Sequence, residues 1–247
     1  MTYCLAMRLR EGLVLLSDTR TNAGVGNVST HCKLHVFHPT VDRTFVLQSA
    51  GNLATTQEVL DRIERDLADP DASESLRSAN RLFEAALYVG RLSVAVAGAH
   101  RAALVSAGAG GTSTFLLSGQ IGDDTPNAFL VYPEGNYIRA SDERPFLQIG
   151  ETKYGKFLLE LATEANLGLE DASKVALSSM VSTARANISV GPPYDLGLYR
   201  PGTHIVEHSR IDAGSGYLHD LEQVWTRHLR RALLELPMVD PAGTRRI

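Results

Sequence analysis

The apolar residues of this chain are spaced in two different periods, and stretches with the same period are grouped together along the sequence. A two-residue period, expected of half-buried strands, marks residues 3–9, 12–17, 34–38 and 43–49. A helical period begins at residue 52, and strand-like runs, two helical stretches, closing strands and a last helix follow. Grouped elements of this kind favour antiparallel sheets with helices stacked outside them, which is an α+β fold.

The bounds of the other elements are expected from turn residues and from helical spacing. One helix ends at Pro70, and Ser73 is expected to cap a second helix that reaches about residue 90. Short apolar runs bounded by turn residues predict strands at 102–108, 113–121, 128–132, 136–140 and 146–150. Later elements are two helices, marked by 154–161 and 177–188, strands at 194–199 and 204–210, and a helix at 217–234. With no repeat or low-complexity linker, we predict one domain over 1–236 and a loose tail at 237–247.

Composition and charge exclude several classes of protein. The chain has 247 residues, 24 basic and 28 acidic side chains, and a net charge of −4 without a polybasic stripe, which predicts no nucleic-acid partner. No apolar run approaches the roughly 20 residues of a membrane helix, and charged residues interrupt the early apolar run, so neither a membrane span nor a signal peptide is expected. Cys4 and Cys32 form no disulfide framework and indicate a reducing, cytoplasmic compartment.

The histidines and glycines give no sign of a metal or cofactor. His31 and His35 fall in a loop-to-strand region without a Glu-x-x-His context, so no zinc site is predicted. The glycine-rich run 108–111 is not followed by Gly-Lys-Ser/Thr, which favours a turn over a phosphate loop. We therefore predict a protein that carries neither metal nor cofactor.

The start of the chain carries the strongest chemical signal. Removal of Met1 would give Thr2 a free α-amine beside its hydroxyl, and that amine, with a reference pKa of about 7.7 to 8.0, can serve as the base that a threonine nucleophile needs. A cation at Lys33 would keep the amine neutral and favour the alkoxide. Asp18 can anchor Lys33, because an antiparallel hairpin of the first two strands places Asp18 beside Thr2. Arg20 would orient the Asp18 loop.

Each of these residues also has an ordinary interpretation. A threonine after the initiator methionine is common, an aspartate after a strand is usually a turn residue, and a lysine before an apolar strand is usually solvated. The joint spacing of Thr2, Asp18 and Lys33 is what favours a catalytic interpretation.

That spacing carries a resemblance. Thr2, the strand pair, Ser17-Asp18-Thr19-Arg20, Lys33 and the run Ala50-Gly51-Asn52 before a helix resemble a proteasome-type β-subunit of the N-terminal nucleophile hydrolases. The opening Met-Thr-Tyr-Cys and the run Ser-Asp-Thr-Arg-Thr-Asn-Ala-Gly are similar to the bacterial branch called Anbu, the ancestral β-subunit. The first 35 residues or so are the specific part, and the rest agrees in element order.

The resemblance implies a four-layer αββα sandwich and an acyl-enzyme formed by Thr2, with Lys33 lowering the amine pKa and Asp18 holding Lys33. Gly51 would offer its backbone N–H to the oxyanion, although a plain strand-to-helix turn is the alternative. Ser189 would support the amine. Further residues would line the substrate cleft: Thr21, Asn22, Cys32, Ser49 and Leu53.

The chain also departs from the pattern of that family. The spacing from Asp18 to Lys33 is one residue short, although Lys33 is the only lysine before Lys153. Glu151 stands where a supporting serine is usual, with a helix N-terminal acid as its simpler role. Asn187 stands where an aspartate is usual. These departures leave the level of peptidase activity open.

Three functions follow from these residues. The first is a threonine peptidase that acts on peptides or unfolded proteins inside a self-compartmentalising homo-oligomer, either a ring or an open spiral, with an ATPase or other accessory partner left open. The second keeps the fold and hydrolyses or transfers a small amide. The third is a weakly active subunit that serves as an assembly or partner-binding module.

Overall fold

The computed structural model describes residues 2–22, 28–164 and 167–238, with side chains except at positions 22, 28 and 162–164. The first sheet contains β1 (Tyr3–Leu9), β2 (Gly12–Asp18), β10 (Phe146–Gly150), β11 (Tyr194–Tyr199) and β12 (Val206–Ile211), in the order β10-β1-β2-β11-β12. The second sheet contains β5 (Leu34–Thr40), β6 (Arg43–Gly51), β7 (Ser113–Ile121), β8 (Asn127–Val131) and β9 (Tyr137–Arg139), in chain order. A small hairpin pairs β3 (Arg20–Asn22) with β4 (Val28–Thr30). The helices are α1 (Leu53–Ala68), α2 (Leu82–Ser106), α3 (Lys156–Glu164), α4 (Leu169–Ala186) and α5 (Gly216–Glu235).

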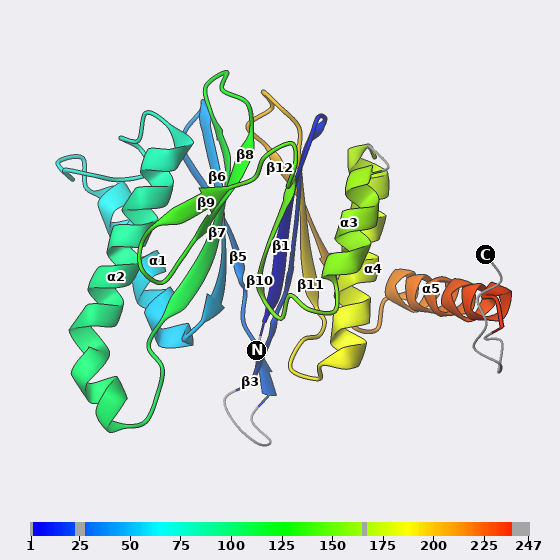
Figure 1. Ribbon diagram of the computed structural model, residues 1–247. Helices are drawn as coiled ribbons and strands as arrows, with labels where there is room; N and C mark the ends of the chain where they lie inside the picture. Colours follow the sequence, from blue (N-terminus) through cyan, green and yellow to red (C-terminus); the bar gives the residue numbers. More distant parts are fainter. Residues whose placement is uncertain (1, 23–27, 165–166, 239–247) are drawn as a thin grey trace, which may run out of the picture.

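The two large sheets are antiparallel and stack between two helix layers (Figure 1). Helices α1 and α2 cover the outer face of the second sheet, and α3 and α4 cover the outer face of the first. Apolar clusters fill all three spaces between these layers. The α+β class and the four-layer αββα sandwich are thereby confirmed.

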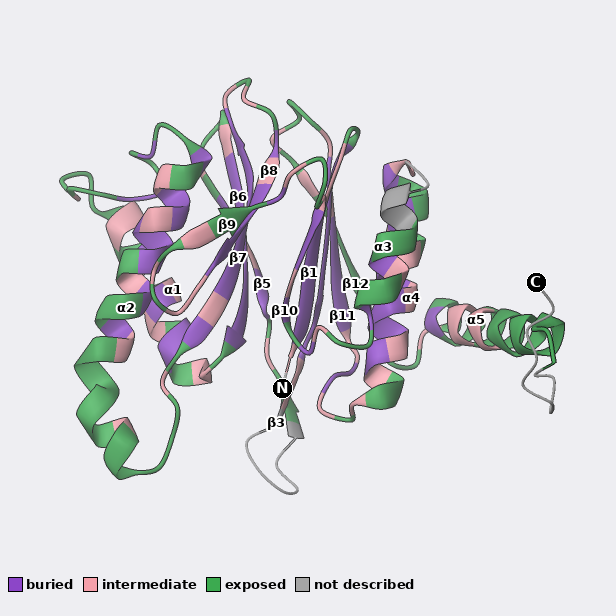
Figure 2. Cartoon of the chain, viewed as in Figure 1, coloured by how far each residue is buried: buried purple, intermediate pink, exposed green. Residues whose placement is uncertain are grey.

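The strands β1, β2 and β11 of the first sheet are buried on both faces, because helices cover one side and the second sheet covers the other. On β1, Tyr3 and Leu5 pack toward the helices, whereas Cys4 and Ala6 pack between the sheets. Figure 2 shows this as continuous burial along β1 and its neighbours. Each fully buried Leu or Met side chain stabilises the fold by roughly 1.5–3 kcal/mol relative to exposure, so these central strands hold the sandwich together.

One predicted strand and one predicted helix start are wrong. Residues 102–108, expected as a strand, lie mainly in the last turns of α2, and the helix expected from Ser73 begins only after Arg81, its N-cap. The segment 94–103 is rich in alanine, the best helix former, and has no proline to end the helix. Glu84 accepts from the Asn80 and Arg81 amides, which fixes the start of α2. The hairpin of β3 and β4 was not predicted.

Helix α2 is long and apolar enough to cross a membrane, judged by length and composition alone. Its buried residues, including Tyr88, Val89 and Val96, belong to the cluster beneath the second sheet, and 44% of its most apolar window is buried. Core helices pass the same test, and packing against the second sheet accounts for the apolar residues in the first half of α2.

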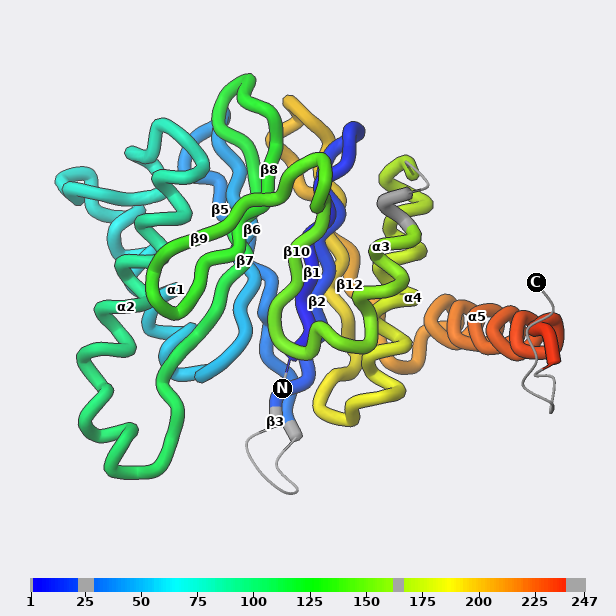
Figure 3. The backbone as a smooth tube through the Cα atoms, in the orientation of Figure 1, coloured from blue at the N-terminus to red at the C-terminus, as the bar shows by residue number. Residues whose placement is uncertain are grey.

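Helix α5 leaves the body of the molecule. The backbone path turns outward beyond β12, and α5 begins near α4 and projects away from the sandwich without covering a sheet (Figure 3). Its buried residue is Leu218, near the start of the helix. At the other end of the chain, Thr2 enters β1 at the same end of the sandwich as the β3 hairpin.

Candidate active site

Thr2 is held in place by the strands on both sides of it. Its carbonyl accepts a 2.7 Å hydrogen bond from the Glu151 amide, and the next amide, that of Tyr3, donates to Oδ1 of Asp18 at 3.0 Å. Gly150 permits this close approach, because a Cβ there would lie 1.9 Å from the Thr2 carbonyl oxygen. The backbone at Thr2 is therefore fixed on one side by β10 and on the other by the end of β2.

Asp18 and Lys33 form a buried ion pair directly behind Thr2. Nζ of Lys33 donates to Oδ1 of Asp18 at 2.7 Å and to the Arg20 carbonyl at 2.6 Å. Oδ2 of Asp18 accepts from the Gly191 amide at 3.2 Å. Burial raises the pKa of Asp18 above its usual value, and the charge of Lys33, with the Tyr3 and Gly191 amides, acts in the opposite direction. The lysine thus has a fixed position and a fixed counter-charge.

Arg20 holds the loop that follows α4. Its Nη1 donates to the carbonyls of Ile188 at 2.8 Å and Val190 at 3.4 Å, and its guanidinium lies against Gly191, where a Cβ would be 2.3 Å from Cζ. Because Gly191 itself donates to Asp18, Arg20 supports Asp18 through this loop. This geometry fits the orienting role expected for Arg20.

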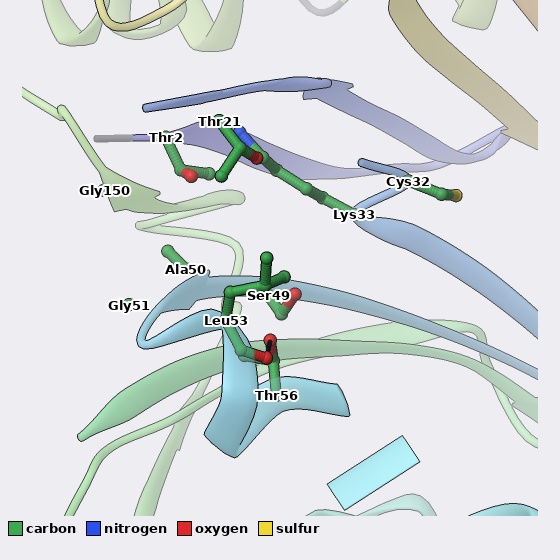
Figure 4. Close-up of a pocket in the computed structure, with 10 residues that line it drawn as sticks. All are labelled: Thr2, Thr21, Cys32, Lys33, Ser49, Ala50, Gly51, Leu53, Thr56 and Gly150. Atoms are coloured by element: carbon green, nitrogen blue, oxygen red, sulfur yellow. Dashed lines mark hydrogen bonds between the residues drawn. The ribbon is translucent and has the colours of Figure 1, made fainter. Parts of the chain in front are cut away.

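A cleft of about 430 Å³ opens beside Thr2 (Figure 4). Six of the residues predicted from sequence line it together with Thr2: Thr21, Cys32, Lys33, Ser49, Gly51 and Leu53. The sequence analysis missed Ala50, Thr56 and Gly150. Of these, Thr56 could have been found, because it follows Leu53 by one helical turn and therefore lies on the same face of α1. The side chain of Asn22 lies outside the described residues.

Gly51 lies at the edge of the cleft where β6 passes into α1. Its φ is +123°, and a Cβ would lie 2.5 Å from the Thr112 carbonyl oxygen, so glycine is required there. The next residue, Asn52, caps α1 by accepting the Thr55 amide at 3.0 Å. The cleft therefore faces a helix N-terminus, which carries a partial positive charge.

Cys32 lines the cleft. The side chain is exposed and its Sγ donates to the Leu34 carbonyl at 3.1 Å. Desolvation raises the pKa of this thiol above its usual value. Because the thiolate is the nucleophilic form of cysteine, this direction favours Thr2 over Cys32 as the nucleophile candidate of the cleft.

The support behind Thr2 differs from what the sequence suggested. Glu151 is not a helix N-terminal acid, since α3 begins only at Lys156; it is buried, and its Oε2 accepts from Nδ2 of Asn187 at 2.9 Å. Ser189 lies on the loop held by Arg20, and its amide donates to Oδ1 of Asn187 at 3.0 Å. Ser189 does not line the cleft, and its support of the amine stays a prediction.

Among the residues that the structure describes, no three His, Cys, Asp or Glu side chains are grouped so as to hold a metal ion. The groups that the cleft brings together are the Thr2 hydroxyl, a lysine in a fixed position and backbone amides. This is the equipment of a nucleophilic hydrolase.

No protein-family model matches this chain, and no curated protein sequence matches it. Solved structures do. Anbu (ancestral beta-subunit) from Yersinia bercovieri is 37% identical, with a TM-score of 0.89 over 97% of this chain and 99% of that one. An Anbu (Gly-1) mutant from Hyphomicrobium sp. strain MC1 is 38% identical, with a TM-score of 0.88 over 97% and 100%. The subunit in the helical assembly of the Anbu complex from Pseudomonas aeruginosa is 35% identical, with a TM-score of 0.88 over 98% and 100%.

These matches span nearly the full length of both chains, at identities well above those at which only a fold is shared. They agree with the fold and with the family resemblance seen in the sequence. The chain belongs to the Anbu (ancestral β-subunit) family.

Proposed function

We propose that this protein is an N-terminal threonine peptidase, active after removal of Met1 and assembled from copies of itself. The observation that carries the proposal is the placement of Thr2 in one cleft with Lys33, whose ammonium is fixed by the buried Asp18 carboxylate at 2.7 Å. A structural role alone does not call for a buried ion pair beside an accessible hydroxyl.

The reaction would begin with attack of the Thr2 hydroxyl oxygen on the substrate carbonyl carbon. The hydroxyl proton passes to the α-amine, and Lys33 favours both the neutral amine and the developing alkoxide through its charge. The C–N bond then breaks, the amine returns the proton to the leaving nitrogen, and an ester on Thr2 remains. Water, deprotonated by the same amine, hydrolyses that ester and regenerates the hydroxyl.

The oxyanion formed by this attack would lie near Gly51 and the start of α1. A backbone N–H and the partial positive charge of a helix N-terminus stabilise negative charge at such a position. The requirement for glycine at this point, with φ at +123°, keeps side-chain atoms away from the reacting carbonyl.

The cleft wall suits an uncharged side chain of the substrate. Ser49, Ala50, Leu53 and Thr56 contribute small polar and apolar surface, and the charge of Lys33 is already paired with Asp18. An extended peptide with a small or medium apolar residue before the cut is the substrate that this lining favours.

Self-assembly is the second part of the proposal. The related Pseudomonas aeruginosa protein forms a helical assembly. In this chain, α5 carries Leu218, Trp225, Leu229 and Leu233 at spacings of 7, 4 and 4 residues, which places them on one helix face. Leu218 is 3% exposed, but Leu229 and Leu233 are 45% and 67% exposed. The apolar face therefore continues past the body of the subunit, where a second copy would cover it.

The peptidase proposal is tested on the nucleophile. Mass spectrometry of the purified protein is expected to show loss of Met1 and covalent labelling of Thr2 by a peptide epoxyketone. Thr2→Ala is expected to abolish labelling and peptide hydrolysis while leaving the assembly intact. Thr40→Ala, which removes an exposed hydroxyl bound to Asp42 at the far end of β5, is the matched control and keeps both activities. Retention of Met1 in cells would contradict the proposal.

A small-amide hydrolase or acyl transferase is the alternative function, and the size of the cleft is compatible with it. A volume of about 430 Å³ falls within the range of small-molecule sites. Turnover of small amides by a protein that leaves a panel of peptides intact would select this function over the peptidase.

A further inference from the structure

We propose that Glu151 is a positioning residue that holds the α-amine of Thr2 once Met1 has been removed. The inference rests on the proposed role of Thr2 and assigns a specific role to an acid that stands where the family resemblance would place a supporting serine. Four features carry it: the backbone contact between the two residues, the burial of the carboxylate, its fixation by Asn187, and its lack of a described cation.

Glu151 is the direct cross-strand neighbour of Thr2. The register of β1 and β10 pairs Tyr3 with Gly150, and the 2.7 Å bond from the Glu151 amide to the Thr2 carbonyl extends this pairing by one residue. The left-handed conformation of Gly150, with φ at +83°, redirects the chain at this point. The Thr2 nitrogen belongs to the residue whose carbonyl binds the Glu151 amide. A group on that nitrogen is therefore held near Glu151 by a backbone with a fixed position.

The carboxylate of Glu151 is buried and has a defined position. The residue is 9% exposed, and its Oε2 accepts from Nδ2 of Asn187 at 2.9 Å. Asn187 is oriented in turn, because its Oδ1 accepts from the Ser189 amide at 3.0 Å and Arg20 holds the adjacent Ile188 carbonyl. The loop after α4 thus fixes the acid beside Thr2 rather than leaving it in solvent.

The charges of the site leave Glu151 without a cation of its own. Asp18 and Lys33 neutralise each other at 2.7 Å, and Arg20 directs its Nη1 to two carbonyl oxygens. Among the described residues, no Lys, Arg or His nitrogen lies within salt-bridge distance of the Glu151 carboxylate; Asn187 is the side chain that binds it. A buried carboxylate without an opposite charge is costly, and the α-ammonium of a processed Thr2 is a cation that would arise at the correct place.

In this arrangement, two opposite charges influence the protonation of the Thr2 α-amine. Lys33 favours the neutral amine, which can accept the hydroxyl proton, and Glu151 favours the ammonium that forms when that proton arrives. A carboxylate near an amine raises the pKa of the amine, so removing the negative charge of Glu151 lowers it. A hydrogen bond from the amine to Glu151 also fixes the direction in which the single lone pair of the neutral nitrogen points.

The test measures the amine itself and does not require turnover. The chain is expressed behind a removable fusion whose protease leaves Thr2 as the first residue. The α-amine is then labelled with acetic anhydride over a range of pH, and the N-terminal peptide is quantified by mass spectrometry. In Glu151→Gln, which keeps an acceptor for Asn187, we expect the titration midpoint to fall by about 1 pH unit. Glu143→Gln removes an exposed acid from the loop before β10 and is expected to leave the midpoint unchanged.

A rescue variant separates charge from shape. In the double variant Glu151→Gln, Asn187→Asp the carboxylate moves to the opposite member of the pair, and the midpoint is expected to return toward that of the parent. An unchanged midpoint in a folded Glu151→Gln protein would overturn the proposal.

A crystal structure of the processed parent chain gives a check that needs no variant. We expect the Thr2 nitrogen at hydrogen-bond distance from a Glu151 oxygen, and a separation beyond about 4 Å overturns the proposal. If the midpoint shifts as expected but neither an epoxyketone nor a peptide reacts, the peptidase function fails while the positioning role stands. If labelling of Thr2 proceeds with the parental pH profile in Glu151→Gln, the positioning role fails and the peptidase function stands.

Discussion

At the residue scale, burial of the Asp18–Lys33 ion pair costs folding free energy, but it gives the site a charge in a fixed position. Burial raises the pKa of Asp18 even though a lysine and two amides act against the rise. Removing two charges from water costs several kcal/mol per ion, and mutual attraction often does no more than balance that cost. The pair is therefore better understood as a means of fixing a cation beside Thr2 than as a source of stability.

This view predicts how stability responds to the loss of one partner or of both. Lys33→Met leaves the Asp18 carboxylate buried without its cation and is expected to lower the free energy of unfolding by about 3–5 kcal/mol. The double variant Asp18→Asn, Lys33→Met removes both charges and is expected to recover most of that loss. Lys153→Met, at an exposed lysine, is the control and should stay within about 0.5 kcal/mol of the parent. Urea unfolding gives these values, and equal losses in single and double variants would contradict the prediction.

At the element scale, the first turn of α1 connects folding to the cleft. Leu53 and Thr56 line the cleft, and both lie in the turn that Asn52 caps. The Asn52 side chain also donates to the Gly110 carbonyl at 2.8 Å, which ties the start of α1 to the segment before β7. The shape of the cleft wall therefore depends on a helix cap.

Asn52→Ala is expected to lower the free energy of unfolding by about 1 kcal/mol, because the Thr55 amide loses its acceptor. The same change should weaken peptide hydrolysis through KM more than through kcat, because the cleft wall moves while Thr2 and Lys33 stay in place. Asn80→Ala, at an exposed asparagine outside the cleft, provides the comparison. Thermal unfolding and steady-state kinetics check both parts, and an unchanged melting temperature would exclude the cap as a stabilising element.

At the scale of the whole molecule, contacts within one subunit do not account for the apolar face of α5. Its first half rests on the body through Leu218, and Trp225 donates to Ser182 Oγ at 3.0 Å. The second half continues the same apolar face into solvent (Figure 2). An apolar stripe of this length on a projecting helix fits a contact between copies.

Leu229→Gln combined with Leu233→Gln is expected to shift the protein from large assemblies toward smaller species in analytical ultracentrifugation. The reason is that both side chains lie on the face that continues from Leu218. Leu234→Gln, at a side chain that is 87% exposed on a different part of the helix surface, is the matched control. Sedimentation of the double variant like the parent would show that this face is not the contact.

The sequence predicted most of the elements and part of the site for identifiable reasons. The hairpin of β1 and β2 is local, so its register, and with it the proximity of Asp18 to Thr2, follows from the alternation and the short turn. Residues 102–108 were misassigned because a short apolar run suits a strand or a helix equally well, and here the mostly exposed segment continues α2. The roles of Glu151 and Asn187 could not be predicted, because their contact joins β10 to the far end of α4.

By itself, the sequence determined the two-sheet pattern, the hairpin that places an acid next to Thr2, and the glycine that opens α1. These depend on periods and turns within a few residues of one another. Only the tertiary structure decided that Lys33 reaches Asp18, that the wall of the cleft comes from β6 and α1, and that Glu151 lies buried against Asn187. Such contacts join segments far apart in the chain, and they form because the sheets must stack and bury their shared face.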